Sequence, residues 1–294
     1  MAGLKEIRTR ISSISSTQKI TSAMKMVSAA KFHKAQDVIL HYSPYSKKIQ
    51  NLLARIIPIA PDSVVEKWFT KPEKTKKAAL VVVTSNSSMC GGFNLNLLKY
   101  INEEAPKLFP ELWGTSQMSL FCLGKKGADY LRKKGLAVDL IDTDVVNNPS
   151  FSYSAAFCSK LIEDFKGQKF DTIHVAYNYF KNPALQEPRI EALLPFTQPS
   201  ENSTKSMPHN LIFEPDQEYI LNILIPLAIK TYFHNVILEN SIGEHGARMT
   251  AMHQATENAI ELTKELKLQY NKARQAAITK EILEIVSGAE ALKG

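Results

Sequence analysis

Residues 252–283 read MHQATENAIELTKELKLQYNKARQAAITKEIL, and this stretch decides the fold. Apolar or small residues recur in it at alternating steps of three and four, with breaks at Gln269 and Lys280. This spacing keeps one stripe on one face of a helix for about four heptads, which is typical of a coiled-coil seam. The predicted seam consists of Met252, Ala255, Ala259, Leu262, Leu266, Ala273, Ala276 and Leu283.

The N-terminal end carries a matching pattern. A helical stripe starts there at Leu4, Ile7, Ile11 and Ile14. No Gly or Pro occurs between Gly3 and Pro44, so we expect one helix over 1–58 with a kink or local break at Pro44. A second long helix is expected over 210–290. Because the two terminal helices lie far apart in sequence, they are natural partners for each other.

The charge of the chain is unevenly placed. The formal net charge is +7, and the residues through Arg55 carry about +8, from ten basic residues against Glu6 and Asp37. A basic helix of this kind favours an acidic partner, whether protein, nucleic acid or lipid headgroup. A basic coiled coil that binds nucleic acid is the lowest-ranked hypothesis for the function of the chain, because Phe32 is the main aromatic residue among the positive ones.

Cysteines and hydropathy give expectations about compartment. Cys90, Cys122 and Cys158 are odd in number and share no short spacing, which favours free thiols in a reducing compartment over a disulfide framework or zinc site. The N-terminus lacks the apolar core of a secretory signal. The longest apolar run, Ile220–Ile229, is too short to cross a bilayer. Any membrane association is therefore expected to go through a partner.

Between the helices, residues 76–205 alternate strand-like and helix-like patterns. The run Ala78–Thr84, AALVVVT, suits a strand buried on both faces. Further strands are expected at 119–123, 138–143, 172–180 and 190–194, and helices at 94–108, 125–134 and 152–165. This alternation predicts an α/β domain with a mainly parallel sheet and covering helices, a small Rossmann-like unit. Linkers are expected at 58–77 and 195–205.

The loop Met89–Asn94, MCGGFN, follows the first strand where a phosphate-binding turn would lie. It lacks both GxGxxG and GxxxxGK[ST], so a tight strand-to-helix turn accounts for its glycines. A nucleotide-binding enzyme that uses the α/β domain is the alternative function. Cys90 has no histidine nearby in sequence, which favours a packed thiol over a nucleophile.

The histidines do not form a metal motif. HExxH is absent and His245 stands eight residues from His253, so Glu244 and both histidines are interpreted as solvated or partner-facing helix residues. No cofactor or metal site is expected in the chain.

Two helical segments carry candidate contact residues. Met24 and Met26 flank Lys25, giving an adaptable apolar surface with one charge, although one of the two methionines is expected in the seam. Near the C-terminus, hydrogen-bonding groups gather on the helix at Arg274, Gln275, Thr279 and Glu281. A solvated face is the default interpretation of such groups, and a helix inserted into a protein sleeve would use them for register and steering.

Several stretches closely resemble F-type ATP synthase gamma subunits. They are AGLKEIRTRI from Ala2, TQKITSAMKMVSA from Thr17, TS at Thr84 with MCGGFN from Met89, EHGARMTAM from Glu244 with ATENA from Ala255, and YNKARQAAITKEILEIVSGA from Tyr270. The resemblance covers the whole chain in order, and the terminal stretches are the most specific.

The resemblance implies a non-catalytic rotor. The terminal helices would form an antiparallel coiled coil inside a ring of three alpha and three beta subunits. The α/β domain would rest, with the epsilon subunit, on the membrane ring of c subunits, whose proton-driven rotation would drive ATP synthesis or be driven by hydrolysis. By motif, Met24 and Lys25 would lie near acidic beta-subunit loops, and Arg248 belongs to the ARM motif. The residues that would engage a beta-subunit loop are Arg274, Gln275, Thr279 and Glu281.

The chain also departs from the family pattern. Position 25 is Lys where many relatives carry Glu, and the residues before Cys90 lack a common Asp-Arg pair. The redox insertion of chloroplast members and a transit peptide are missing. The resemblance therefore implies a bacterial enzyme, with this chain peripheral on the cytoplasmic face of the inner cell membrane.

Overall fold

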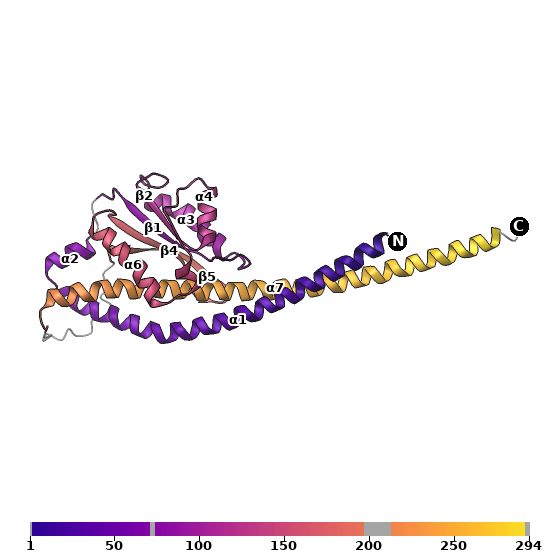
Figure 1. Cartoon of the computed structure of the whole chain (residues 1–294), viewed down its shortest axis with the longest axis horizontal. Helices are drawn as coiled ribbons and strands as arrows, with labels where there is room; N and C mark the ends of the chain where they lie inside the picture. The colour runs from indigo at the N-terminus through magenta and orange to yellow at the C-terminus, as the bar shows by residue number, and fades with distance from the viewer. Residues whose placement is uncertain (1, 71–73, 197–212, 292–294) are drawn as a thin grey trace. The chain divides into compact units, whose positions relative to one another are not determined.

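The computed structural model describes residues 2–70, 74–196 and 213–291 of the chain. Two long helices, α1 (Ala2–Ile56) and α7 (Gln217–Ala291), begin and end this part, and the α/β elements lie between them in sequence (Figure 1). The helices between them are η1 (Ile57–Ile59, a 3-10 turn), α2 (Asp62–Phe69), α3 (Phe93–Leu108), α4 (Lys125–Lys133), α5 (Asp144–Asn147) and α6 (Phe151–Lys166). The strands are β1 (Ala78–Val83), β2 (Met118–Leu123), β3 (Leu140–Asp142), β4 (Thr172–Asn182) and β5 (Leu185–Leu194).

Contacts divide the chain into two compact units, and both long helices contribute to each. One unit is the helix pair Met1–Ser28 with Met249–Gly294, and the other is Ala29–Arg248. In the helix pair, Thr256 Oγ1 lies 2.8 Å from Thr21 Oγ1, and Lys25 Nζ lies 3.4 Å from His253 Nδ1. Residue numbers rise along α1 as they fall along α7, so the pairing is antiparallel.

The predicted coiled-coil pattern is confirmed for α1 and half confirmed for α7. A continuous stripe of buried or half-buried α1 positions, spaced by three and four, is formed by Leu4, Ile7, Ile11, Ile14, Gln18, Thr21, Lys25 and Ser28. On α7 the seam keeps Met252, Ala259, Leu266 and Ala273. Between them it uses Thr256, Thr263, Tyr270 and Ala277, each one residue later than predicted. The apolar pattern missed these positions because three of the four carry hydroxyl groups. Of the other predicted seam residues, Ala255 is half-buried, and Leu262, Ala276 and Leu283 are exposed.

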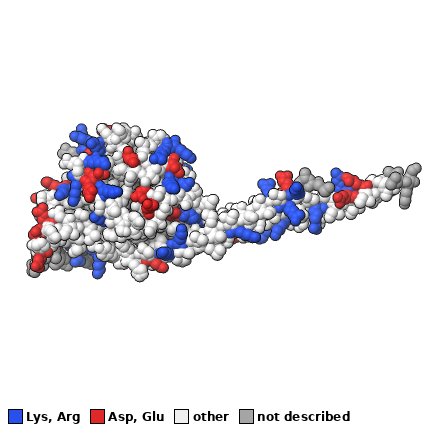
Figure 2. All heavy atoms as spheres, viewed as in Figure 1, with Lys and Arg blue, Asp and Glu red and all other residues white. Residues whose placement is uncertain are grey.

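Basic side chains lie on the surface of the helix pair. Lys5, Arg8, Arg10 and Lys19 of α1 are all exposed, and Figure 2 shows Lys and Arg interspersed with acidic residues along this unit. The positive charge of the N-terminal sequence is therefore available to a partner.

The sheet of the other unit is mixed and has the order β3-β2-β1-β4-β5. The pairs β3-β2, β2-β1 and β1-β4 are parallel, as predicted. In contrast, β5 pairs antiparallel with β4, because only Pro183 and Ala184 separate the two strands and so short a connection can join only antiparallel neighbours. The predicted strand 190–194 is the second half of β5.

Each face of the sheet has its own core. Alternate residues of β1 point to opposite faces, and all six are buried. Leu80 and Val82 pack with Leu97, Ile101 and Leu131 of α3 and α4. Across the sheet, α6 and α7 cover the other face (Figure 1). The residues of that second core include Val81, Val83, Leu161, Ile225 and Phe233.

Three local predictions differ from the structure. The helix α1 runs unbroken through Pro44, whose side chain is exposed. The predicted linker 58–77 contains α2, because Val64 and Trp68 are buried in the core of the second unit. The short helix α5 was not predicted. Most of the predicted linker 195–205 lies outside the described residues.

Among the described helices, α7 alone is long and apolar enough over one stretch to cross a membrane. More than half of that stretch is buried inside this fold, as in the core helix of a globular protein. The three cysteines are free, as predicted, and all three are buried, which was predicted for Cys90 alone.

Candidate functional site

The loop between β1 and α3 is held by hydrogen bonds among its own residues. Met89 and Gly91 adopt left-handed backbone, with φ of 67° and 58°. Asn94 accepts a hydrogen bond from the Ser85 N–H at 3.0 Å, and its Nδ2 donates to Ser85 Oγ at 2.7 Å and to Cys90 Sγ at 3.3 Å. Burial raises the pKa of the Cys90 thiol. The thiol is therefore protonated at neutral pH, which does not suit a nucleophile.

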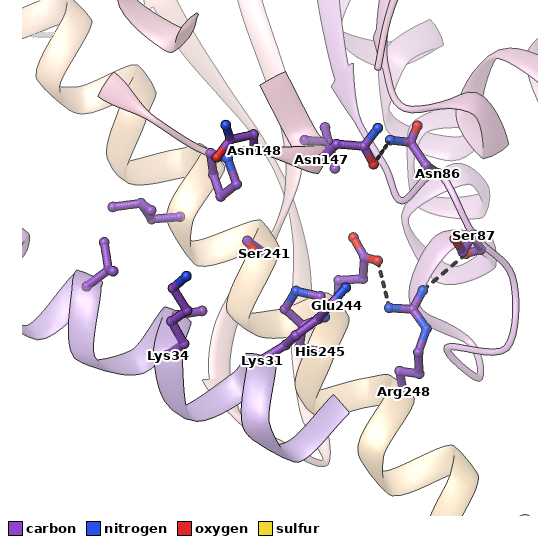
Figure 3. Close-up of a pocket in the computed structure, with 15 residues that line it drawn as sticks. Lys31, Lys34, Asn86, Ser87, Asn147, Asn148, Ser241, Glu244, His245 and Arg248 are labelled. Atoms are coloured by element: carbon purple, nitrogen blue, oxygen red, sulfur yellow. Dashed lines mark hydrogen bonds and ion pairs between the residues drawn. The ribbon is translucent and has the colours of Figure 1, made fainter. Parts of the chain in front are cut away.

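Arg248 and Glu244 form a buried ion pair where α7 passes this loop (Figure 3). Arg248 is 9% exposed and donates from Nη1 to Glu244 Oε1 at 2.7 Å and from Nη2 to the Ser87 carbonyl oxygen at 3.3 Å. Burial raises the pKa of Glu244, and the Arg248 charge opposes that rise. Both groups thus have partners inside their own unit.

A polar cavity of about 330 Å³ lies beside the ion pair. Lys31 and Lys34 of α1 line one side, and Asn147 and Asn148 line another (Figure 3). His245 also faces it, and burial, followed by the charges of Arg248 and Lys31, lowers the pKa of His245 to about 4. This histidine is therefore neutral at physiological pH.

The interpretation as solvated or partner-facing was wrong for Glu244, whereas His245 is half-buried beside the cavity. Glu244 is 8% exposed, and His245 Nδ1 is buried with no hydrogen-bond partner among the described residues. Glycines 243 and 246 were the available signal, because glycines inside a helix often mark a close approach of another element. His253, in contrast, is exposed and lies near Glu257, with 3.9 Å between Nδ1 and Oε1.

The two methionines around Lys25 differ in environment. Met24 and Lys25 are half-buried, and Met26 is 63% exposed. Lys25 occupies a seam position beside His253, so its ammonium group lies at the edge of the coiled coil. Met24 and Met26 therefore point to different sides, as predicted.

The residues predicted near the C-terminus of α7 are all exposed. At about 100° per residue, Arg274 and Glu281 share one row on the helix, and Gln275 and Thr279 share a second row roughly 120° away. Between the rows lies an apolar stripe formed by Ile278, Ile282 and Ile285, which are 48%, 56% and 71% exposed. Among the described residues, nothing in the chain covers this surface. An exposed apolar stripe flanked by hydrogen-bonding groups is typical of a protein-binding surface.

The structure thus separates the predicted residues into three places. Met24 and Lys25 lie in the helix pair, and Arg248 is buried in the other unit. The exposed end of α7 carries Arg274, Gln275, Thr279 and Glu281. Because they lie in separate places, these residues do not form one catalytic site.

Comparison with known proteins gives consistent matches over the whole chain. A family profile described as ATP synthase matches residues 3–292. The ATP synthase gamma chain of Flavobacterium psychrophilum is 46% identical over 100% of both chains, and that of Chlorobium phaeobacteroides is 38% identical over 100% of both. A chain of the Euglena gracilis mitochondrial ATP synthase, in a structure of OSCP, F1 and c-ring, shares the fold with a TM-score of 0.66 at 18% identity. The match covers 99% of this chain and 95% of that chain.

Proposed function

This chain belongs to the ATP synthase gamma-chain family, the non-catalytic central-stalk subunit of the F1Fo enzyme, and from that premise we propose how its surfaces couple rotation to ATP turnover. The enzyme is a membrane-associated complex. In the proposal, α1 and α7 turn inside a ring of alpha and beta subunits, and each orientation presents different contacts to each catalytic beta subunit. A ligand or partner can shift a conformational equilibrium only through such differential contacts.

The end of α7 supports the first contact of this proposal. Its apolar stripe of Ile278, Ile282 and Ile285 fits inside an apolar sleeve, and the flanking rows of Arg274, Gln275, Thr279 and Glu281 supply hydrogen bonds to a beta-subunit loop. Because the stripe covers only one side of the helix, rotation of the helix inside the ring would bring the stripe to a different subunit in each orientation.

The basic segment of α1 supports the second contact. Exposed Met26 and the half-buried pair Met24 and Lys25 lie among basic side chains, which suits acidic loops of the beta subunits. Lys25 would add a positive charge to that contact where many relatives carry Glu.

The proposal extends to the remaining partners and to location. The α/β unit would rest with the epsilon subunit on the c-ring, and the chain would be peripheral on the cytoplasmic face of a bacterial inner membrane. The bacterial origin of the relatives at 38% and 46% identity supports this location.

The observation that carries the proposal is the exposed stripe of α7 in a chain that matches gamma chains from end to end. We would place a photoreactive residue at Met89, which is 61% exposed, and cross-link it to a stationary subunit in the purified complex. ATP hydrolysis and proton pumping should both stop in the cross-linked fraction, and unirradiated complex is the control. Full coupled activity in completely cross-linked complex would refute the rotor.

A further inference from the structure

About two and a half turns of α7 are fastened to the α/β unit from several sides. The residues are Asn240, Gly243, Glu244, Gly246 and Arg248, and we call them the α7 seat. We propose that the α7 seat holds the helix against turning about its own axis relative to the sheet, and that Arg248 is a positioning residue in it rather than a contact to another subunit. This inference rests on the proposed function, in which torque passes between the α/β unit and α7.

Hydrogen bonds fasten the first part of the seat to the sheet. Asn240 accepts from the backbone N–H of Asn178 at 3.5 Å, and Asn178 Nδ2 donates to the Phe93 carbonyl oxygen at 3.0 Å. Asn178 and Asn240 are each 1% exposed. Because buried amides keep their partners, this connection joins α7 to β4 and to the start of α3.

Two glycines allow neighbouring elements to approach the helix closely. A Cβ atom on Gly243 would lie 3.1 Å from Phe93 Cε2 and 3.3 Å from Gln186 Cγ. A Cβ atom on Gly246 would lie 3.1 Å from Pro183 Cα and 3.3 Å from Phe32 Cε2. Glycine is unfavourable inside a helix, so its presence at both positions fits a need for close packing against the β4–β5 hairpin and α1.

The Arg248 fork fastens the last part of the seat. One of its nitrogens bonds Glu244 on the preceding turn, and the other bonds the Ser87 carbonyl oxygen in the loop after β1 (Figure 3). A guanidinium group can make both bonds at once because its donors are fixed in one plane, whereas a lysine would reach only one of them well.

The seat residues surround much of the helix. At about 100° per residue, they span roughly 200° of its circumference. The neighbours come from α1, from the β4–β5 hairpin, from the start of α3 and from the loop after β1. Rotating α7 about its axis by one residue position, about 100°, would move every seat residue away from its neighbour. The geometry therefore resists axial rotation in both directions.

The test uses the complete complex in sealed vesicles, with ATP hydrolysis and ATP-driven proton uptake measured together. We expect R248A to keep at least half of the wild-type hydrolysis rate while protons pumped per ATP fall at least threefold. R248K should lie between, because it can pair with Glu244 but not also reach Ser87. K264A, which removes an exposed cation of the same helix, should match wild type in both measurements.

Amide hydrogen exchange separates the seat from a subunit contact. In assembled R248A complex, residues 85–92 and 240–248 should both exchange at least tenfold faster than in wild type. Wild-type exchange at 85–92 together with a wild-type pumping ratio would overturn the inference, as would a change confined to another subunit. If R248A assembles only in part, and hydrolysis and pumping fall in proportion so that the protons pumped per ATP are unchanged, that outcome also counts against the seat.

Failure of assembly and absence of coupling are also informative. If R248A does not assemble, R248K decides: a lowered pumping ratio supports the seat and an unchanged ratio overturns it. If the wild-type complex does not couple hydrolysis to pumping, the proposed function fails first, and this is recognised because R248A and K264A then behave as wild type does.

Discussion

Glu239 shows at the scale of one residue what a sequence pattern does not reveal. It lies on α7 beside Glu191, whose carboxylate accepts hydrogen bonds from Tyr177 and Tyr232. Asn235 donates to Glu239 Oε1 at 2.9 Å, while Oε2 is buried with no hydrogen-bond partner among the described residues. Burial, with the nearby Glu191 charge, raises the pKa of Glu239 to about 7.

The raised pKa gives stability a definite dependence on pH. Glu239 binds a proton more tightly in the folded state than in the unfolded chain. The stabilisation from this proton is complete below about pH 4.3 and is lost as the pH rises to about 7. Glu239→Gln, which stays neutral, should raise the free energy of unfolding at pH 8 by roughly 1–3 kcal/mol, and the gain should shrink towards zero at pH 4–5. Urea unfolding at both pH values measures it, with exposed Glu257→Gln as the control. An equal gain at both pH values would contradict the assignment.

Individual residues also mark the limit of prediction from sequence. The hydroxyl groups of Thr21 and Thr256 meet across the seam, and the charges of Glu244 and Arg248 are buried together. In each case a polar residue is buried because a specific partner satisfies it. Thr21 and Thr256 lie on different helices, and Arg248, besides its bond to Glu244 one turn earlier, reaches Ser87 in the loop after β1. Hydrophobic periodicity detects apolar burial but not satisfied polar burial.

At the scale of elements, length and regularity made the long helices and the parallel strands predictable. The strand β1 was predicted because it is buried on both faces and reads as one apolar run. Half of β5 was missed, since an edge strand that carries Pro188 and charged residues has no such pattern. α2 was missed because the prolines around it suggested a linker, while the burial of Trp68 that stabilises it is a tertiary effect.

The helix pair offers a test of the observed seam. Leu266 is 4% exposed and Leu268, two residues on, is 63% exposed. Leu266→Ala should destabilise the pairing by about 2–3 kcal/mol, because it removes buried apolar surface from a seam that has few large residues. Amide hydrogen exchange over residues 4–18 of α1 should accelerate accordingly. Leu268→Ala is the matched control, and equal acceleration in both variants would show that the seam is misplaced.

At the scale of the whole molecule, the sequence resemblance predicted the family, and the comparisons confirm it. Its partner contacts stay predictions, because a single chain cannot show which side chains another subunit covers. Arg248 illustrates the difficulty: its motif suggested an external contact, while its two hydrogen bonds stay within its own unit.

The contact proposed for the end of α7 can be tested in the assembled enzyme. Gln275→Leu should lower coupled ATP-driven pumping about two- to tenfold, because the hydrogen bonds of its row are lost while the helix remains intact. Gln269→Leu is the matched control, since Gln269 is also exposed and lies roughly 120° away around the helix. Vesicle pumping and hydrolysis rates of both variants measure the effect. Equal values for the two variants would remove Gln275 from the proposed contact.

The bare isoleucines of α7 also bear on how cells balance the supply of this chain. A copy made in excess of its partners displays Ile278, Ile282 and Ile285 to solvent, and such exposed apolar surface promotes aggregation and capture by quality-control proteases. Assembly hides the same surface. Surplus copies should therefore be degraded quickly. Degradation of unassembled copies, and not synthesis alone, would then set the ratio of this chain to its partner subunits.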